Sequence, residues 1–464
     1  MAEFRIIGDS EPDAGFRDST ITAPIDTLPN ELIAHIFTMG STSEPPRLYR
    51  RTSRSLPFPL LVSSISRRWR DAAISSPPLW SRLLFTATLA DSWISRLFLP
   101  RSGTHPLDIH INLEYAVHSM ERVLEIILPH CERWRTLCVN RLSLLKLTLP
   151  AIRDISVPLL QHVEILGQYE ASGVPAHTSH TPFFQLGAPA LTSVSLRSIC
   201  AECGPPLANL TAFLFDYKGP LSQQCLESIV AASPGLQVLR LASRTFEGSG
   251  QGPIHIPSLR QLSLNFGGCT SDDDFIRLFA IIIAPDLESL EIVSMSEIRA
   301  SRLLFHCTQS SSYPRPRTLK LSKLHDVTLP SYHALFSLFP TVTSLSLLDG
   351  DSNPALSQLP ALKHITYGRS PYYFPFFSAK KGKEDSFIDW ICGHVRGCHG
   401  TPQAMESVHT NRLAHTIRET IGCLVDVVVL ANGADSLRDS WASDNGDGSL
   451  IIQSDDDFDG VWGS

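Results

Sequence analysis

The chain has 464 residues, of which 43% are hydrophobic and 18% are charged, and its formal net charge is −7. This length is typical of two to four domains, and the apolar content is enough for a large core, which excludes a chain that is disordered throughout. The negative charge and the lack of any basic run of five residues speak against a surface that binds nucleic acid.

The ten cysteines are scattered, and residues 1–20 hold acidic residues where a secretory signal would have an apolar segment. We therefore expect a reducing, intracellular location, cytoplasmic and/or nuclear, with the cysteines acting as small buried apolar residues. The longest apolar runs, such as Phe279 to Pro285, are too short to span a membrane, so no membrane partner is expected.

Residues 1–25 are polar and show no periodicity, which predicts a loose tail. A helix is expected to begin near Pro29, because the N–H that proline lacks would have no partner in the first helical turn. Glu31 places negative charge at the positive end of the helix dipole. The apolar stripe that follows consists of Leu32, Ile33, Ile36 and Phe37.

Residues Gly40 to Pro59 are rich in Ser, Pro and Arg and are expected to form a loop. A second helical pattern follows, and Pro77-Pro78 ends it. Its apolar positions are Leu61, Ile65, Trp69 and Ala72, with Arg67, Arg68 and Arg70 largely on the opposite side. A unit as small as 26–88 cannot bury this much apolar surface alone, so it should pack on its neighbour or offer an apolar patch to a partner.

Residues 89–130 are expected to form a linker or an N-terminal cap, and the alternation from Asp108 to Leu113 predicts a half-buried strand. Over residues 131–372 a Leu-x-x-Leu-x-Leu phrase recurs, usually just after a proline. Clear copies are Leu191/Val194/Leu196, Leu236/Leu239/Leu241, Leu259/Leu262/Leu264, Leu287/Leu290/Ile292, Val342/Leu345/Leu347 and Leu362/Ile365/Tyr367. Weaker copies are Ile152/Ile155/Val157, Leu210/Phe213/Phe215 and Pro316/Leu319/Leu321.

From Leu191 onward these blocks start 19 to 29 residues apart, which fits one strand and one helix per unit. Helical patterns lie between the blocks, over 221–230, over 271–283 with a Ser271–Asp274 cap, and over 331–339. Units of this kind predict a curved solenoid, a parallel sheet with its helices outside. The alternative is an ordinary α/β domain that happens to alternate.

The repeat is lost after residue 372. Residues 373–440 are expected to form a C-terminal cap. Residues 441–464 are acidic and rich in glycine, which predicts a disordered tail.

The phrase LPNELIAHIF, followed by LLVSSISRRWRDAAISSPPLWSRL, resembles the F-box motif in the long-insert form typical of basidiomycete fungi. The motif covers residues 26–84, and WISRLFLPRSGTHPLDIHI, CERWRTLCVN and the leucine blocks extend the likeness to about residue 370. The resemblance implies a three-helix module that binds the Skp-type adaptor of an SCF (Skp, cullin, F-box) ubiquitin ligase. The chain departs from the shorter family form by its Gly40–Pro59 insert and by Ile65-Ser66 where many members have Val-Cys.

Apolar helices laid against a partner, with leucine and tryptophan as anchors, are a common mode of recognition. Some residues of the motif must instead form the module's own core. Internal packing and adaptor contact both stay open for Trp69 and Trp80, whereas contact is favoured for Leu28 and Pro29. Carried over by position, the residues that face the adaptor would be Leu28, Pro29, Leu32, Ile36, Leu61, Val62, Ile65, Trp69, Leu79 and Trp80.

No catalytic phrase is present: the sequence has no Gly-x-Ser-x-Gly, P-loop, His-Glu-x-x-His or dinucleotide-binding fingerprint. Neither a metal nor another cofactor is expected. Cys200-x-x-Cys203 lacks the second pair that a zinc site needs. The segment with Cys392, His394, Cys398 and His399, together with His409, His415 or Cys423, could ligate zinc in the cap but matches no known zinc spacing.

The sequence thus predicts a helical F-box joined to an irregular leucine-rich-repeat solenoid. The expected function is that of a non-catalytic adaptor, which brings an unknown protein substrate to a cullin-RING ligase through the Skp-type protein. The alternatives are a leucine-rich interaction scaffold outside any ligase, and an enzyme of unknown type. Substrate contact is expected on the inner strand face or its rim loops.

Overall fold

The structure, a computed structural model, describes residues 24–43, 57–86, 93–113, 117–140, 150–166, 183–199, 205–248, 252–265, 272–309, 315–323, 327–348, 356–368, 382–401, 404–410, 417 and 420–429. The predicted tails, apart from Pro24 and Ile25, lie outside these residues, as do Cys200 and Cys203. Among the described residues, no helix combines the length and the apolar character needed to cross a membrane.

Three helices, α1 (Asn30–Ser43), α2 (Phe58–Ile65) and α3 (Arg67–Ile74), pack on one another in what we call the helical module, residues 24–80. The 3-10 turn η1 (Pro24–Thr27) precedes them and η3 (Pro77–Trp80) follows. Ser66 separates α2 from α3, and its Oγ accepts the N–H of Trp69 at 3.1 Å, which caps α3. Because α1 reaches Ser43 and α2 starts at Phe58, the prediction of a loop over all of 40–59 is wrong at both ends.

A sheet of 14 parallel strands forms the rest of the described chain, and its strands lie in sequence order. They are β1 (Arg82–Thr86), β2 (Leu107–Asn112), β3 (Trp134–Asn140), β4 (His162–Leu166), β5 (Ser193–Arg197), β6 (Ala212–Ser222), β7 (Val238–Glu247), β9 (Gln261–Asn265), β11 (Ser289–Val293), β12 (Thr318–Ser322), β13 (Ser344–Leu348), β14 (His364–Gly368), β15 (Ser407–Thr410) and β16 (Asp426–Val429). A separate short pair joins β8 (Ile254–His255) to β10 (Ile282–Ile283).

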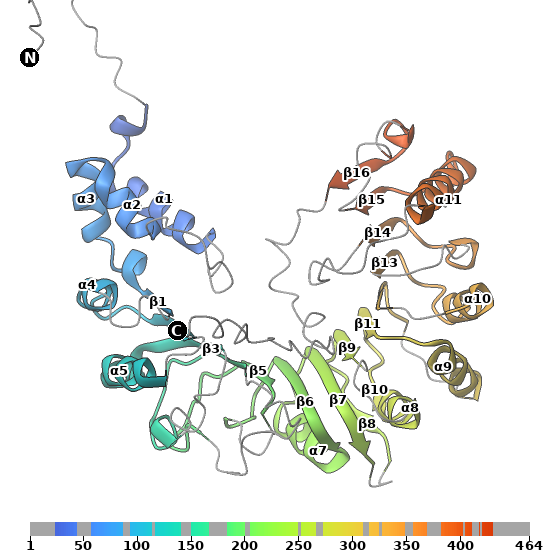
Figure 1. The fold of residues 1–464 in the computed structure, drawn as a ribbon, viewed down its shortest axis with the longest axis horizontal. Coiled ribbons are helices and arrows are strands. Elements are labelled where there is room, and N and C mark those ends of the chain that lie inside the picture. Colours follow the sequence, from blue (N-terminus) through green and yellow to red (C-terminus); the bar gives the residue numbers. More distant parts are fainter. Residues whose placement is uncertain are drawn as a thin grey trace, which may run out of the picture.

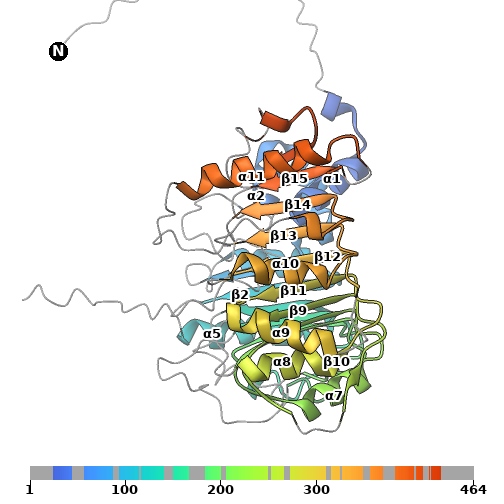
Figure 2. The ribbon, with the colours of Figure 1, turned by 90° about the vertical axis from the view of Figure 1, so that its right-hand side faces the viewer.

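The sheet curves into an open arc, residues 82–429, with its strands inside and its helices outside (Figure 1). The helices of the arc are α4 (Trp93–Arg101), α5 (Val117–Ile127), α7 (Gln223–Ala232), α8 (Asp272–Ile281), α9 (Glu297–Gln309), α10 (Leu329–Ser337) and α11 (Gly382–Cys398). Figure 2 shows the strands from β9 to β15 stacked side by side behind α8 to α11. The helical module lies at the end of the arc where β1 begins.

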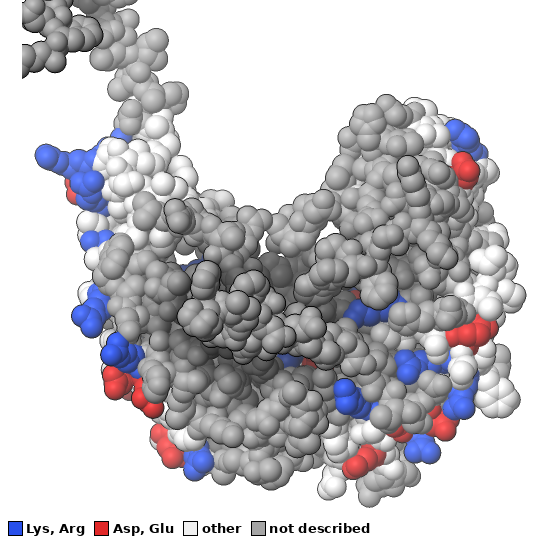
Figure 3. Space-filling model, viewed as in Figure 1, with Lys and Arg blue, Asp and Glu red and all other residues white. Residues whose placement is uncertain are grey.

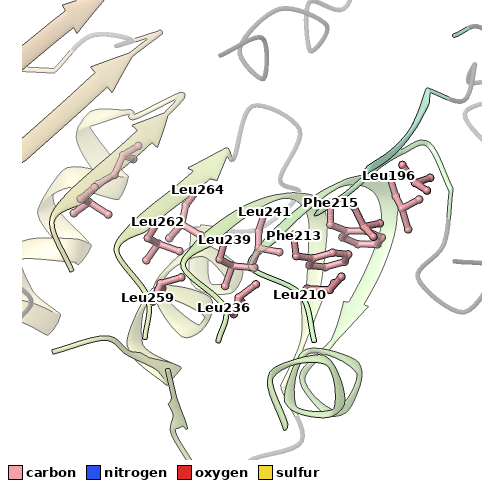
Figure 4. Close-up of a cluster of buried hydrophobic side chains, with 14 of the residues drawn as sticks. Leu196, Leu210, Phe213, Phe215, Leu236, Leu239, Leu241, Leu259, Leu262 and Leu264 are labelled. Carbon is pink, nitrogen blue, oxygen red and sulfur yellow. The ribbon is translucent and has the colours of Figure 1, made fainter. Parts of the chain in front are cut away.

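Two apolar rows run along the sheet on the side of the helices, because alternate residues of a strand point to the same face; the first crosses all 14 strands and the second runs from β1 to β13. The first row is Leu83, Ile109, Leu137, Val163, Val194, Phe213, Leu239, Leu262, Leu290, Leu319, Leu345, Ile365, Val408 and Val427, all buried and in register. The second is Phe85, Ile111, Val139, Ile165, Leu196, Phe215, Leu241, Leu264, Ile292, Leu321 and Leu347. Figure 4 shows how these side chains from β5, β6, β7 and β9 meet beneath the strands.

The proline before six of the eight blocks that become strands forms a turn. In the phrase Ser233-Pro234-Gly235-Leu236 the N–H of Leu236 donates to the Ser233 carbonyl at 3.1 Å, which closes a turn with proline at its second position. Six further turns have the same bond and the same proline. Their closing residues are Leu160, Leu191, Leu259, Leu287, Val342 and Leu362. Each turn buries its closing residue at the start of the next strand.

The predicted Leu-x-x-Leu-x-Leu blocks become strands in eight cases, β5, β6, β7, β9 and β11 to β14. The strand predicted at Ile152/Ile155/Val157 is wrong. The turn closes at Leu160, and the strand that follows it is β4, whose buried apolar residues are Val163 and Ile165. Helices α7, α8 and α10 occupy the predicted helical stretches, although Ser271, the predicted cap of α8, lies outside the described residues.

The sheet also reaches beyond the predicted repeat. It begins at Arg82 and continues through β15 and β16, within the region expected to be a cap. The strand predicted at 108–113 is β2, but it is buried on both faces, since His110 and Asn112 are buried as well as Ile109 and Ile111. The expectation of a half-buried strand is therefore wrong.

Candidate partner-binding surface

Helix α1 leaves an apolar stripe in solvent. Leu32, Ile36 and Met39 are 49%, 45% and 57% exposed, and their spacing of four and three residues places them on one side of the helix. The buried side of α1 is formed by Ile33 and Phe37, which join the core. The single apolar stripe predicted for this helix is therefore divided: one side packs in the core and the other side faces solvent.

Helix α2 repeats this arrangement. Leu61 and Ile65 are 48% and 57% exposed and lie one helical turn apart, whereas Val62 is buried in the core. Helix α2 contains no charged residue, and Glu31 is the sole acidic or basic residue of α1 apart from His35. The apolar side chains of the two helices therefore lie on a surface with almost no charge.

Arginines of α3 fix the positions of both helices. Arg68 donates from Nε to Asn30 Oδ1 at 3.0 Å and from Nη2 to the Leu28 carbonyl, so it holds the start of α1. Arg70 donates from Nε to the Ser63 carbonyl at 2.9 Å, near the end of α2. Figure 3 shows basic side chains at the outer edge of the module, over α3, beside an uncharged area over α1 and α2.

The two tryptophans differ from each other. Trp80 is fully buried: its Nε1 donates to the Ala73 carbonyl at 2.7 Å, its ring meets Phe98 edge-on at 5.0 Å, and Arg101 lies over it at 4.4 Å. Trp69 is half-buried against Phe37, with ring centroids 5.0 Å apart. Trp80 therefore joins the module to α4, and Trp69 serves mainly to pack α3 on α1.

Of the ten residues predicted to face an adaptor, three lie in the chain's own core: Val62, Leu79 and Trp80. The expectation of contact is wrong for Val62 and Leu79, because a side chain with almost no exposed surface cannot bury more. For Trp80, where internal packing and contact were both open, the burial favours internal packing. Leu28 and Trp69 are partly buried against the core. Pro29 and the four exposed apolar residues Leu32, Ile36, Leu61 and Ile65 stay available.

Exposed apolar residues are concentrated in this module. Thirteen large apolar side chains are exposed among the described residues, and seven of them belong to the module: Ile25, Leu32, Ile36, Met39, Leu61, Ile65 and Ile74. The other six are spread over the much longer arc at Leu159, Leu186, Ile298, Phe305, Leu329 and Val428. We call Leu32, Ile36, Met39, Leu61 and Ile65 the apolar face; clusters of this kind mark sites of association. Met39 was missed from the sequence because its neighbours read as the start of a loop.

The inner face of the arc is polar. In register from β7 to β15 it carries Arg240, Ser263, Glu291, Lys320, Ser346, Thr366 and His409. The charged residues of this row are Arg240, Glu291 and Lys320. Arg260 and Glu288 lie just before β9 and β11 and pair with each other at 3.6 Å.

The cap residues considered for zinc do not come together. Cys392 is buried in the core, Cys398 Sγ lies 3.8 Å from His394 Nε2 on α11, His409 bonds Ser407 on β15, and Cys423 is exposed. His415 lies outside the described residues. Within the described part of the chain, one group of three potential ligands comes together elsewhere, at Cys138, His162 and Glu164. This group could not be found from the sequence, because its residues come together only through the register of β3 against β4.

Comparison with known proteins adds no name to this geometry. No protein-family model matches the chain, and no curated protein matches it.

Proposed function

We propose that the chain is an F-box-type adaptor: the helical module binds a Skp-type protein through the apolar face, and the arc, an irregular leucine-rich-repeat solenoid, holds a protein substrate. The observation that carries this proposal is the exposed, uncharged apolar face on α1 and α2, within the segment that resembles the F-box. The five side chains of the apolar face are 45–57% exposed, so covering them would contribute about half of the roughly 1.5–3 kcal/mol that full burial is worth, about 1 kcal/mol each.

The structure supports a rigid docking element. The apolar face belongs to helices, and Arg68 and Arg70 hold those helices by hydrogen bonds to backbone carbonyls. Trp80 packs between the module and α4, so the module is joined to the arc by a buried contact. A rigid connection suits an adaptor, because substrate lysines must be held near a conjugating enzyme to gain effective concentration.

The arc supports the second half of the proposal. Solenoids present long curved surfaces, and its inner rows offer polar and charged side chains for a protein ligand. The chain needs no catalytic group of its own in this role, because the ligase partners supply the chemistry.

The test is co-expression of the full chain with a fungal Skp-type protein and its cullin, followed by capture of the complex. The double change Leu32→Asp, Ile65→Asp alters two exposed side chains and leaves the core intact. Ile298→Asp, on the exposed side of α9, is the matched control. We expect wild type and control to capture both partners, and the double variant to lose at least about 2 kcal/mol of adaptor binding, roughly 30-fold in Kd.

Each outcome has a clear meaning. Capture of the Skp-type protein without cullin would favour an interaction scaffold outside the ligase. Equal loss in the control variant would place the adaptor elsewhere on the chain. If folded wild type, checked by circular dichroism, captures neither partner, the F-box proposal is wrong.

A further inference from the structure

Three potential metal ligands meet on the inner side of the arc, near its first strands. Cys138 comes from β3, and His162 and Glu164 come from β4; one ligand atom of each lies within 4.8 Å of the other two. Cys138 and Glu164 are register partners, and both point away from the apolar rows because Leu137, Val139, Val163 and Ile165 fill those rows. Thiolate, imidazole and carboxylate are the donors that zinc takes in proteins.

A fourth potential ligand lies on the neighbouring strand. His110 of β2 is the register partner of Cys138 on its other side. The side chain is only 7% exposed, and its Nδ1 atom has no hydrogen-bond partner in the described part of the chain. A buried polar atom without a partner is unfavourable, and coordination of a metal ion would give this nitrogen the partner it lacks.

The hydrogen bond of His162 leaves one ring nitrogen for a metal. His162 Nδ1 lies 2.9 Å from Ser193 Oγ on β5. When Nδ1 donates to that oxygen, Nε2 carries the free lone pair, which is the usual way in which a second residue orients a histidine ligand.

The charges around the group suit a divalent cation. A Cys138 thiolate and the Glu164 carboxylate would supply two negative charges, which match the charge of Zn²⁺. Asp108 and Arg135, next to the group, form an ion pair with each other. The nearby cation Arg82 donates from Nη1 to the Ser41 carbonyl at 3.2 Å, in the helical module.

We propose that Cys138, His162, Glu164 and His110 bind one Zn²⁺ ion on the inner face of the arc and so tie β2, β3 and β4 together. This site is independent of the adaptor proposal and was not expected from the sequence. The Cys138 thiol loses its proton to solvent as the Zn–S bond forms. His110 lies outside the group of three, so the proposal requires its ring to turn toward Cys138 to reach the ion.

The first measurement is the metal content of the full chain, purified with a tag that contains no histidine. We expect about one zinc ion per chain by mass spectrometry. After removal of metal with a chelator and addition of Co²⁺, a thiolate-to-cobalt charge-transfer band should appear, which reports the Cys138 ligand directly. Re-addition of Zn²⁺ should abolish the band.

Variants separate the ligands from their surroundings. Cys138→Ser should lose the band, and Glu164→Gln should weaken zinc affinity by more than the roughly 10- to 100-fold that loss of a supporting residue costs. Ser193→Ala, which removes only the support of His162, should weaken it about 10-fold. Cys131→Ser, in the turn η4 (Leu128–Arg133) just before β3, is the matched control and should keep both zinc and the band.

Two results would overturn the proposal: a folded wild-type chain that takes up neither Zn²⁺ nor Co²⁺, or a charge-transfer band that persists in Cys138→Ser. If Cys138→Ser does not fold, Glu164→Gln decides, since Glu164 is half-buried and its replacement keeps the shape. Unchanged zinc affinity in folded Glu164→Gln would also count against the site.

Discussion

The helical module leaves side chains such as Leu32 and Ile65 in solvent, whereas the arc buries two continuous rows of apolar residues against its helices. In the arc each strand between β1 and β16 has a neighbour on both sides, so one strand–helix unit covers the apolar surface of the next. Among the described residues, the three short helices of the module have no such neighbour over α1 and α2. Under the adaptor proposal, these uncovered apolar residues are the place where the partner would bind.

The largest expected effect concerns the junction of the two regions. Trp80→Ala should lower the free energy of unfolding by about 3–5 kcal/mol, because it empties a buried site against Phe98 and removes a hydrogen bond to Ala73. Denaturant unfolding followed by circular dichroism measures this change. A loss below about 1 kcal/mol would show that Trp80 is not a core residue and would restore it as a possible partner contact.

A pair of neighbouring positions on α1 sharpens the comparison. Ile33→Ala should cost about 2–5 kcal/mol of stability, because Ile33 is buried. Ile36→Ala should change stability by no more than about 0.5 kcal/mol and instead weaken binding of the Skp-type protein. Thermal unfolding and titration calorimetry on both variants separate the two effects. Similar stability losses in the two variants would contradict the division of α1 into a core side and a partner side.

A smaller effect is expected where α3 holds α1. Arg68→Met should cost about 1 kcal/mol of stability, because bonds to the Leu28 carbonyl and to Asn30 are lost. The loss of adaptor affinity should be larger than this, since the start of α1 is no longer fixed. Arg67→Met, at the exposed neighbouring position, is the control for charge. Equal effects of the two changes on affinity would mean that charge matters and position does not.

The smallest expected effect is on the stability of the arc, and it depends on pH. Hydrogen bonds from Ser331 and from the backbone and side chain of Thr328 lower the pKa of Glu297 below its ordinary value of 4.5. The stabilisation is therefore present above pH 4.5 and is lost as the pH falls through the folded-state pKa. Between pH 7 and 3 wild type should lose slightly more stability than Glu297→Gln. Parallel curves of Tm against pH would rule out this role.

Much of the arc could be predicted because its signals are local. A proline followed by leucines three and two residues apart specifies a turn and one face of a strand, and six of the eight strands found from the blocks follow such a turn. The block at 152–157 failed since Pro158, which forms the turn, lies after it and β4 follows that proline. Strand β15 also follows a proline, Pro402, but its apolar positions Met405 and Val408 were not recognised as a block because Thr410 stands where a leucine is expected, and β16 lacks a preceding proline; both strands were taken for part of a cap.

The candidate surface could be predicted only in part. Helical spacing identified Leu32, Ile36, Leu61 and Ile65 as apolar positions, but the same spacing holds for Ile33 and Val62. Which residues face solvent depends on how α1, α2 and α3 pack together. For Trp80 the sequence left internal packing and partner contact equally open, and only the packing of Phe98 on α4 against its ring decides between them.

The sequence by itself determined the periodicity: where helices and strands form, which residues are apolar, and that the leucine phrase repeats. Periodicity is a local property, fixed by the 3.6-residue helix and the two-residue strand. The tertiary structure decided which apolar residues are covered and which distant residues meet. Cys138 and Glu164 lie far apart in the chain, and only the parallel register of β3 and β4 makes them neighbours.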